Sequence, residues 1–282
     1  MPSHAKEAKG IEQPMTDYLT FPTIDPVIFT VLGMPVRWYG VMYLLGFFAM
    51  QRWGYHLAAK PHSGWNKTQV GDLMFYSFIG AVVGGRIGYV VFYQMSAWLT
   101  DPLYLLRIWT GGMSFHGGLI GVAVAMLYYG RKNQQSFLSV TDFGTPMVPI
   151  ALAAGRIGNF INGELWGKTT DVPWAMVFPD GGPLPRHPSQ LYELFLEGIV
   201  LFMIMAWFSA KPRPEGSVGG LILIVYGLFR FIIEFFREPD AHLGLLFGFI
   251  SMGQLLSVPM VLIGGGLVWR GYHRQQKNQE IV

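Results

Sequence analysis

Residues 146–167, PMVPIALAAGRIGNFINGELWG, join an apolar run to a dense group of polar side chains. PMVPIALAA carries no charge, whereas GRIGNFINGELWG contains Arg156, Asn159, Asn162 and Glu164. An arginine at the end of an apolar segment costs several kcal/mol unless it is paired or hydrated. The segment therefore predicts an apolar helix that ends in a functional polar site.

The composition of the chain indicates a membrane protein. Hydrophobic residues make up 51% of the 282 residues, charged residues make up 13%, and the mean hydropathy is +0.35. A soluble surface needs more charge than this. The chain is therefore better divided into membrane spans of about 20 residues than into soluble domains.

Several classes of site and partner are excluded by residue usage. The absence of cysteine excludes disulfides, thiolate metal sites and an internal cysteine nucleophile. No two of the 7 histidines have the spacing with which a helix holds a metal, so we expect no metal. The isoelectric point near 9.0 does not indicate nucleic-acid binding, because the basic residues are spread over many short loops.

Apolar windows predict an all-α polytopic fold with about seven transmembrane helices. The windows lie at residues 38–58, 70–94, 113–130, 143–162, 190–209, 217–236 and 250–270, and the fourth is short and interrupted.

The charges of the loops predict how the helices are oriented. One side of the membrane receives ten basic residues, namely Arg52, Lys60, Lys67, Arg131, Lys132, Lys211, Arg213, Arg270, Arg274 and Lys277. The other side receives six, namely Lys6, Lys9, Arg107, Lys168, Arg186 and Arg237. The positive-inside rule then places the amino terminus in the periplasm and the carboxyl terminus in the cytoplasm.

The domain organisation follows from these spans. We expect an amino-terminal tail and periplasmic arm at residues 1–36, a transmembrane catalytic domain at 37–270 and a cytoplasmic tail at 271–282. Residues 1–14 are polar and receive no function, and without a cleavable signal peptide the first span acts as its own signal. The periplasmic loop 95–112 contains DPLYLLRIW, which is typical of an interfacial helix, and the Pro- and Gly-rich loop 163–188 predicts a small periplasmic cap.

Two helical faces gather polar residues inside the predicted spans. Arg156, Asn159 and Gly163 fall within about 60° of one another on a helix, and Arg230, Glu234 and Arg237 share another face. They have two interpretations. They are structural ion pairs, Arg156 with Glu164 and Arg230 with Glu234, or they form with Glu193 and Glu197 an outward-opening chamber for a phosphate group.

The segment GGMSFHGG, residues 111–118, offers a second candidate site. Glycines before a helix expose backbone N–H groups that bind anions, and His116 is the histidine placed within an apolar span. Its glycines, and those of GGRIG at 84–88, equally suit close packing of membrane helices, and His116 equally suits a packing role.

The segment GRIGNFINGELWG matches the pattern G-R-x-G-N-F-x-N-x-E-x-x-G of prolipoprotein diacylglyceryl transferases. The chain also resembles this family in RWYGVMYLLGF, DPLYLLRIWTGGMSFHGGLIG, LPRHPSQLYELFLEG and GLFRFIIEFFREPD, in that order. It departs from the family in a shorter cap between Phe178 and Leu184.

The resemblance implies a bacterial inner-membrane enzyme whose active site opens toward the periplasm. Such an enzyme moves the diacylglyceryl group of phosphatidylglycerol, drawn from the bilayer lipids, to the lipobox cysteine of a preprolipoprotein signal peptide, without a cofactor. The residues that the resemblance implies are catalytic His116, Arg230 and Tyr39, and substrate-binding Arg156, Asn159, Asn162, Glu164, Gly111, Gly117, Glu234 and Arg237. His116 acts either as a base for the thiol or as a positioning group.

Two other classes of protein share some of these features. A polytopic transporter of an organic anion or lipid also buries arginines near broken helices, and the repeated GRIG at 85–88 and 155–158 would then mark repeated halves. An intramembrane serine protease is disfavoured, because Ser114 and His116 do not face each other on a helix.

Overall fold

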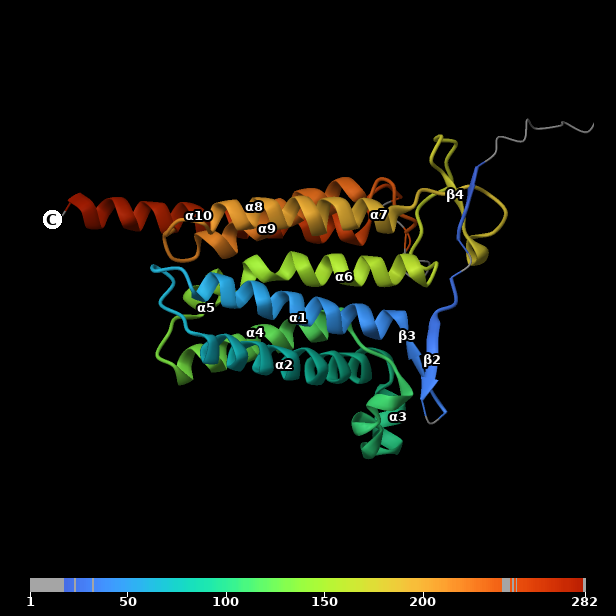
Figure 1. Cartoon of the computed structure of the whole chain (residues 1–282), viewed down its shortest axis with the longest axis horizontal. Coiled ribbons are helices and arrows are strands. Elements are labelled where there is room, and N and C mark those ends of the chain that lie inside the picture. Colours follow the sequence, from blue (N-terminus) through green and yellow to red (C-terminus); the bar gives the residue numbers. More distant parts are fainter. Residues whose placement is uncertain are drawn as a thin grey trace, which may run out of the picture.

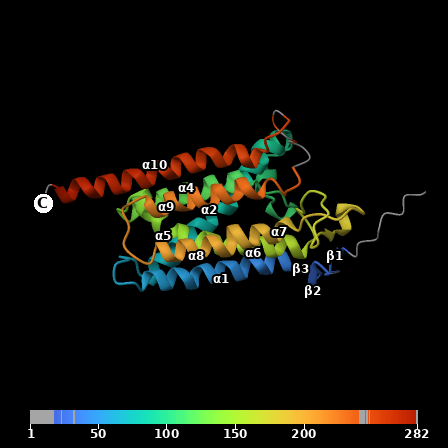
Figure 2. The ribbon, with the colours of Figure 1, turned by 90° about the horizontal axis from the view of Figure 1, so that it is seen from above.

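The computed structural model describes residues 18–280 except 23, 32, 240–243, 245 and 247. The polar segment 1–14, to which we assigned no function, lies outside the described residues. Long helices run side by side and form most of the molecule, while the short strands gather at one end (Figures 1 and 2). The expectation of a mostly helical chain is confirmed.

A helix occupies each of the seven predicted windows. Five of the windows hold a single uninterrupted helix, namely α1 (Trp38–Ala58), α2 (Lys67–Tyr93), α4 (Phe115–Lys132), α9 (Ser217–Ile233) and α10 (Met252–Glu280). The other two are composite: α5 (Phe137–Gly144), η3 (Thr145–Met147) and α6 (Val148–Ile161) form one, and α7 (Ser189–Glu193), η5 (Leu194–Val200) and α8 (Leu201–Phe208) form the other. The last helix continues past residue 270, where we expected a separate tail.

Four of these stretches are long and apolar enough to cross a membrane. They are Lys67–Tyr93, Phe137–Ile161, Ser189–Phe208 and Met252–Glu280. The helix Ser217–Ile233 is apolar but shorter.

The interrupted fourth window has a local cause. Pro146 and Pro149 are the second residues of η3 and α6, in the first turn where a missing N–H is tolerated, but each proline interrupts the hydrogen bonds of a continuous α-helix. A short 3₁₀ turn therefore joins α5 to α6 within one run.

Glycines bring the helices of this bundle into close contact. A Cβ added at Gly84 would lie 2.4 Å from the carbonyl oxygen of Gly117, and one added at Gly121 would lie 1.9 Å from that of Gly80. The backbones of α2 and α4 touch there, as small residues allow between membrane helices. The packing interpretation of the GGRIG segment is confirmed.

The strands and the short helices outside the two composite runs lie at one end of the bundle (Figure 1). They comprise the antiparallel hairpin of β2 (Val27–Val31) and β3 (Met34–Arg37), the parallel pair of β1 (Leu19–Thr20) and β4 (Met176–Val177), and the turns α3 (Met95–Thr100), η1 (Pro102–Leu106), η2 (Ile108–Thr110) and η4 (Pro179–Gly181). The loops 59–66, 131–136 and 209–216 and the end of α10 lie at the opposite end. The two groups of loops that we separated by charge thus occupy different ends.

Arg86 of α2 holds the loop 95–112 against the bundle. Its guanidinium is buried and donates to the carbonyl oxygens of Leu105 at 3.1 Å, Gly111 at 2.6 Å and Tyr104 at 2.7 Å. It also lies 4.9 Å from the centre of the Tyr104 ring. One buried side chain therefore satisfies three loop carbonyls.

The cap has a small core of its own. Phe21, Met176 and Phe178 are buried together, and Arg186 stacks on Trp166 with 4.0 Å between the guanidinium carbon and the ring centre. At the tip, Gly182 has φ +80° and nothing within 4 Å of the position a Cβ would take. The cap is thus packed at its root and open at its tip.

Candidate active site

The GRIGNF segment is positioned by small residues of α6. A Cβ on Gly158 would lie 2.7 Å from the Tyr39 ring, and Gly46 of α1 meets Ala154 in the same close manner. Because α1 lies this near, Tyr39 covers one side of the segment, and its hydroxyl lies 3.0 Å from that of Tyr43.

Arg156 points from α6 toward the helix that begins at Ser189. Its Nε lies 2.9 Å from Glu193 Oε2, and its outer nitrogen lies 3.5 Å from Glu197 Oε2. Another nitrogen donates to Asn159 Oδ1 at 3.4 Å, so the predicted shared face of Arg156 and Asn159 is confirmed.

The predicted pair of Arg156 with Glu164 is wrong. Glu164 Oε1 instead accepts from Asn159 Nδ2 at 2.8 Å and from Asn162 Nδ2 at 3.3 Å. The helix ends at Ile161, and Gly163 with φ +67° turns the chain away. Gly163 therefore does not share the helical face of Arg156 either, and packs on Phe21.

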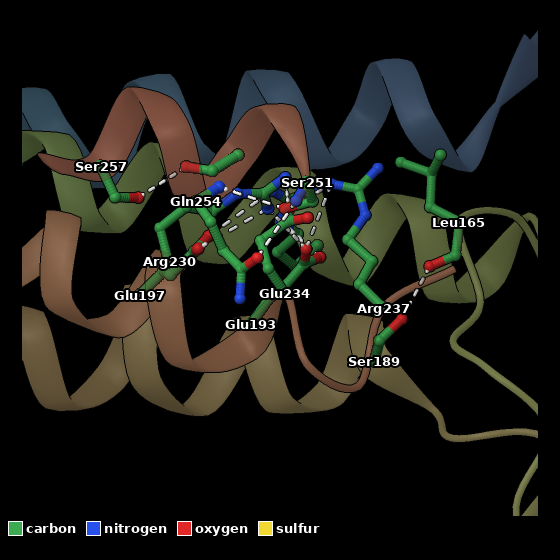
Figure 3. Close-up of polar contacts among 12 residues, drawn as sticks. Leu165, Ser189, Glu193, Glu197, Arg230, Glu234, Arg237, Ser251, Gln254 and Ser257 are labelled. Carbon is green, nitrogen blue, oxygen red and sulfur yellow. Dashed lines mark hydrogen bonds and ion pairs between the residues drawn. The ribbon is translucent and has the colours of Figure 1, made fainter. Parts of the chain in front are cut away.

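The chain just after this turn is strained and anchored. Leu165 has φ +59°, a left-handed conformation that costs about 1–2 kcal/mol for a residue with a side chain. Its carbonyl oxygen accepts from Ser189 Oγ at 2.9 Å (Figure 3). The carbonyl oxygen of Glu164 accepts from Gln190 Nε2 at 2.6 Å. The start of α7 thus fixes the end of the polar segment.

Arg230 of α9 reaches the same carboxylates from the other side. One of its nitrogens lies 2.9 Å from Glu193 Oε1 and 3.8 Å from Glu197 Oε1. The other lies 2.5 Å from Glu234 Oε1, which confirms the predicted pair. Figure 3 shows these contacts converging between the helices.

Glu193 is the shared partner of the arginines. Its two oxygens face Arg156 and Arg230, and Oε1 also lies 3.7 Å from Arg237. Each arginine has five N–H donors in a fixed plane. A carboxylate that binds one edge of a guanidinium therefore fixes the direction of its remaining N–H donors. Glu193 therefore fixes Arg156 and Arg230 relative to each other.

The carboxylates that pair with the arginines are more deeply buried than the arginines. The side chains of Glu193 and Glu197 are 0% exposed, whereas those of Arg156 and Arg230 are each 16% exposed. The partly exposed arginine side chains are thus the part of the cluster that an incoming anion meets. We call Arg156, Arg230, Arg237, Glu193, Glu197 and Glu234 the arginine–glutamate cluster.

Local backbone features place the buried carboxylates. The segment η5 is a π-helical stretch, which widens the helix at the positions that follow Glu193. Gly198 lets this stretch approach α6, since a Cβ there would lie 2.8 Å from Ala153 Cβ. Gly253 makes similar room on α10, because a Cβ would lie 2.5 Å from the Glu234 carboxylate.

The residues of the GGMSFHGG segment are not joined to this cluster by contacts. His116 is exposed at the first turn of α4, with its ring 5.7 Å from that of Phe115, and makes no hydrogen bond within the described residues. Gly117 packs on α2 and gives its N–H to Ser114 Oγ at 3.2 Å. Gly111 has φ +79°, and its carbonyl oxygen accepts from Arg86.

In the part of the chain that the structure describes, no group of three or more His, Asp or Glu side chains is arranged to hold a metal ion. The site is instead a set of forked cations and amides, which suits an oxyanion.

The comparisons with known proteins agree over nearly the whole chain. The sequence profile of prolipoprotein diacylglyceryl transferases matches residues 26–270. The chain belongs to this family. It is 62% identical over 247 residues to the phosphatidylglycerol–prolipoprotein diacylglyceryl transferase of Vibrio cholerae serotype O1, which covers 88% of this chain and 91% of that protein. Two proteins of the same name are also similar, from Vibrio vulnificus (61% over 265 residues, 94% and 98% covered) and Photobacterium profundum (60% over 260 residues, 92% and 98% covered).

Sequence reasoning missed two groups outside the arginine–glutamate cluster. The role of Arg86 was missed because its three carbonyl partners lie 18 to 25 residues away in a loop. His187 was not considered, although its Nδ1 lies 3.1 Å from the Tyr192 hydroxyl, which accepts from Trp174 Nε1 at 2.6 Å. The adjacent RHPSQLYE segment, in which polar residues precede Glu193, was the available signal.

His187 gives the cap a predictable dependence on pH. Burial, and then the charge of Lys168, lower the pKa of His187 below its ordinary value near 6.5. The folded state then binds fewer protons than the unfolded one, so stability is complete above about pH 6.5 and falls as the pH drops through the lowered pKa. We expect the Tm to fall less between pH 7.5 and 5.5 in His187→Gln than in the parent. An unchanged dependence would contradict this assignment.

Proposed function

We propose that this protein transfers the diacylglyceryl group of phosphatidylglycerol to the thiol of a lipobox cysteine in a preprolipoprotein. The thiolate attacks the glycerol carbon that bears the phosphate, a carbon–sulfur bond forms and the carbon–oxygen bond breaks. The electron pair of that bond stays on the phosphate, which leaves as glycerol phosphate. The step balances without a cofactor.

The observation that carries this proposal is the pair of arginines held by one buried carboxylate. Phosphatidylglycerol presents a phosphodiester with one negative charge, and the departing glycerol phosphate carries more. A site for this step needs one group that holds the lipid phosphate and another that meets the growing charge. Arg156 and Arg230 approach Glu193 from different helices, and both arginine side chains are partly exposed whereas that of Glu193 is buried.

Each residue of the segment has a proposed task. Arg156 binds the phosphatidylglycerol headgroup, and Arg230 stabilises the leaving phosphate. Asn159, Asn162 and Glu164 form a hydrogen-bonded set beside Arg156 that orders the headgroup.

The remaining proposed residues surround this centre. Tyr39 lies against Gly158, and Glu234 and Arg237 complete the cluster around Arg230. Gly111 and Gly117 shape the loop and helix that carry His116, rather than offering free N–H groups, because the N–H of Gly117 is already donated.

The thiol has two possible routes to its reactive form. A free cysteine has a pKa near 8.5 and a histidine one near 6.5, so His116 is suited to accept the proton. The alternative is that the local positive charge acidifies the thiol and His116 only positions the peptide. The exposed ring of His116, without a hydrogen-bond partner in the described residues, is accessible for either role.

The proposed membrane arrangement extends the four apolar stretches to seven spans. The end with the strands, the loop 95–112 and the cap 163–188 faces the periplasm, and the end with the basic loops faces the cytoplasm of a bacterial inner membrane. Residues 1–36 form the periplasmic arm, 37–270 the catalytic domain and 271–282 the cytoplasmic tail. Lipid then enters sideways between helices, and the peptide enters from the periplasmic side.

Single cysteines test this orientation in a chain that has none of its own. In intact spheroplasts we expect an impermeant thiol reagent to label Lys168→Cys and to leave Lys60→Cys and Lys132→Cys unlabelled. After lysis all three should react. The reverse pattern in intact cells would overturn the orientation.

The function itself is tested by one incubation. The purified protein is mixed with phosphatidylglycerol and a lipobox peptide, and the peptide is examined by mass spectrometry. We expect a gain of one diacylglyceryl group on the cysteine. Cleavage of the peptide would indicate a protease, and an unchanged peptide together with lipid or anion uptake into proteoliposomes would indicate a transporter.

A further inference from the structure

Two adjoining cavities lie at the end of the bundle remote from the arginine–glutamate cluster. One has a volume of about 320 Å³ and is bounded by the ends of α1 and α8, by α5 and by the start of α9. The other, about 400 Å³, lies between the loop 212–215 and α10. Pro212, Arg213 and Glu215 line both, so Arg213 stands between them.

The basic side chains of these cavities have few partners. Lys60 donates only a long hydrogen bond of 3.4 Å to the carbonyl oxygen of Ser209. Arg213 Nε donates a hydrogen bond of 2.8 Å to the carbonyl oxygen of Phe208, and the Arg213 guanidinium stacks over the Phe208 ring. Within the described residues no carboxylate forms an ion pair with Lys60, Lys211 or Arg213, in contrast to the paired arginines of the active site.

The acidic side chains that line the cavities are already engaged. Asp142 accepts the backbone N–H of Gly216 at 2.6 Å and that of Gly219 at 2.7 Å, and so caps α9. Glu215 accepts a hydrogen bond from Ser136 Oγ. The donors of Lys60, Lys211 and Arg213 thus outnumber the acceptors left to meet them.

Two further observations point to an anionic occupant. The hydroxyl of Ser209, which lines the first cavity, is buried and has no hydrogen-bond partner among the described residues. Burial also lowers the pKa of Lys60, and an anion beside the ammonium would offset that cost. Both groups gain a partner if an oxyanion enters.

The level of the cavities matches that of lipid headgroups. Trp207, near the end of α8, is 72% exposed, and Trp269, next to Arg270, is 69% exposed. Tryptophan is enriched where membrane helices meet the interface. The cations that follow these residues along the chain, Lys211 and Arg270, are therefore at the height of phospholipid phosphates.

We propose that the two cavities form a second binding site, for a phosphate group, in which Lys60 and Arg213 are the central ligands and Lys211 and Arg270 flank them. The site does not belong to the transfer reaction. The tryptophans favour the headgroup of an anionic phospholipid as the source of the phosphate over free phosphate.

Protection of Lys60 from acetylation tests the site on the full-length purified protein in detergent. The probes are short-chain phosphatidylserine, short-chain phosphatidylcholine and inorganic phosphate at matched ionic strength, read by mass spectrometry. We expect phosphatidylserine to slow modification of Lys60 and not of Lys277, which lines neither cavity. Equal protection by inorganic phosphate would assign free phosphate as the source. No protection of Lys60 by either anionic probe, or equal protection by phosphatidylcholine, would overturn the proposal.

Charge-matched variants separate the site from general surface charge. Lys211→Gln with Arg213→Gln should raise the half-protecting concentration at least about tenfold, because charge-assisted hydrogen bonds are lost. Arg131→Gln with Lys277→Gln removes the same charge from exposed positions at that end and should change it little. If both double variants changed the half-protecting concentration equally, a defined binding site would be refuted. Arg213 also holds the Phe208 carbonyl, so Lys211→Gln alone serves as a second variant, because its exposed position should leave the fold unchanged. We expect it to give a smaller shift in the same direction.

Discussion

Replacement of Arg230 by alanine is expected to lower turnover about 10²-fold to 10³-fold while binding of intact phosphatidylglycerol changes much less. The reason is that the charge on the phosphate grows only as the carbon–oxygen bond breaks, so a contact to that charge strengthens in the transition state. Single-turnover transfer to a lipobox peptide gives the rate, and a lipid-binding isotherm gives the affinity.

Arg156 provides the comparison for Arg230. Arg156→Lys keeps the charge but loses the fork, so we expect it to weaken phosphatidylglycerol binding more than it slows the bound complex. The two arginines are equally exposed and share Glu193, so their different effects would reflect their tasks and not their burial. Identical losses of affinity in both variants would contradict the division of tasks.

Loss of either arginine also affects the fold, and the experiment must account for this. Removal of one partner of a buried ion pair costs about 3–5 kcal/mol, and here Glu193 and Glu197 would each lose one of their cations. Arg230→Lys retains a cation for both carboxylates and should preserve the Tm better than Arg230→Ala. If Arg230→Lys has the Tm of the parent but still turns over slowly, the loss of turnover arises in the chemical step and not in folding. If it regains both, Arg230 has only a structural role.

Replacement of His116 by glutamine has the second-largest expected effect. Glutamine keeps the size and a hydrogen bond but is not basic, so removal of a general base should lower turnover about 10²-fold or more near neutral pH. The loss should shrink at alkaline pH, because more of the thiol is then ionised without help. The pH profile of single-turnover transfer, measured for the parent and for His116→Gln, is the deciding observation.

The alternative role of His116 predicts a different profile. A positioning group gives a smaller loss that does not vary with pH. Because His116 is exposed and makes no hydrogen bond in the described residues, its replacement should leave the Tm unchanged, so the activity can be compared without correction for folding. A His116→Gln protein with normal turnover at every pH would remove the base assignment.

The helices were predictable from sequence because the apolar windows are long and separated by polar turns. The starts of α1 and α4 fall within a few residues of the predicted windows, and Arg230 with Glu234 pairs as helical spacing requires. Seven windows gave seven helices, although four stretches meet the criteria of length and hydropathy for a membrane span. The pairing of β1 with β4 could not be anticipated, since it joins segments as distant as Leu19 and Met176.

The partners within the site were harder to predict. Glu193 and Glu197 were assigned to the chamber by their position, but helical spacing relates residues of one helix and says nothing of which carboxylate an arginine on another helix will meet. The nearby Glu164 was the wrong choice for Arg156, because the helix ends before it. The close approach of η5 to α6 at Gly198 helps to bring the correct partners to Arg156.

The open tip of the cap offers a practical use of this architecture. Residues 182–184 are exposed, and lengthening a surface loop costs only about 0.6 kcal/mol for each doubling. An epitope inserted after Gly182 would therefore leave the anchored segment at Leu165 and Ser189 undisturbed. It would give antibody fragments an accessible handle on a small membrane protein, for imaging or for capture on a sensor surface, while the reaction continues beneath it.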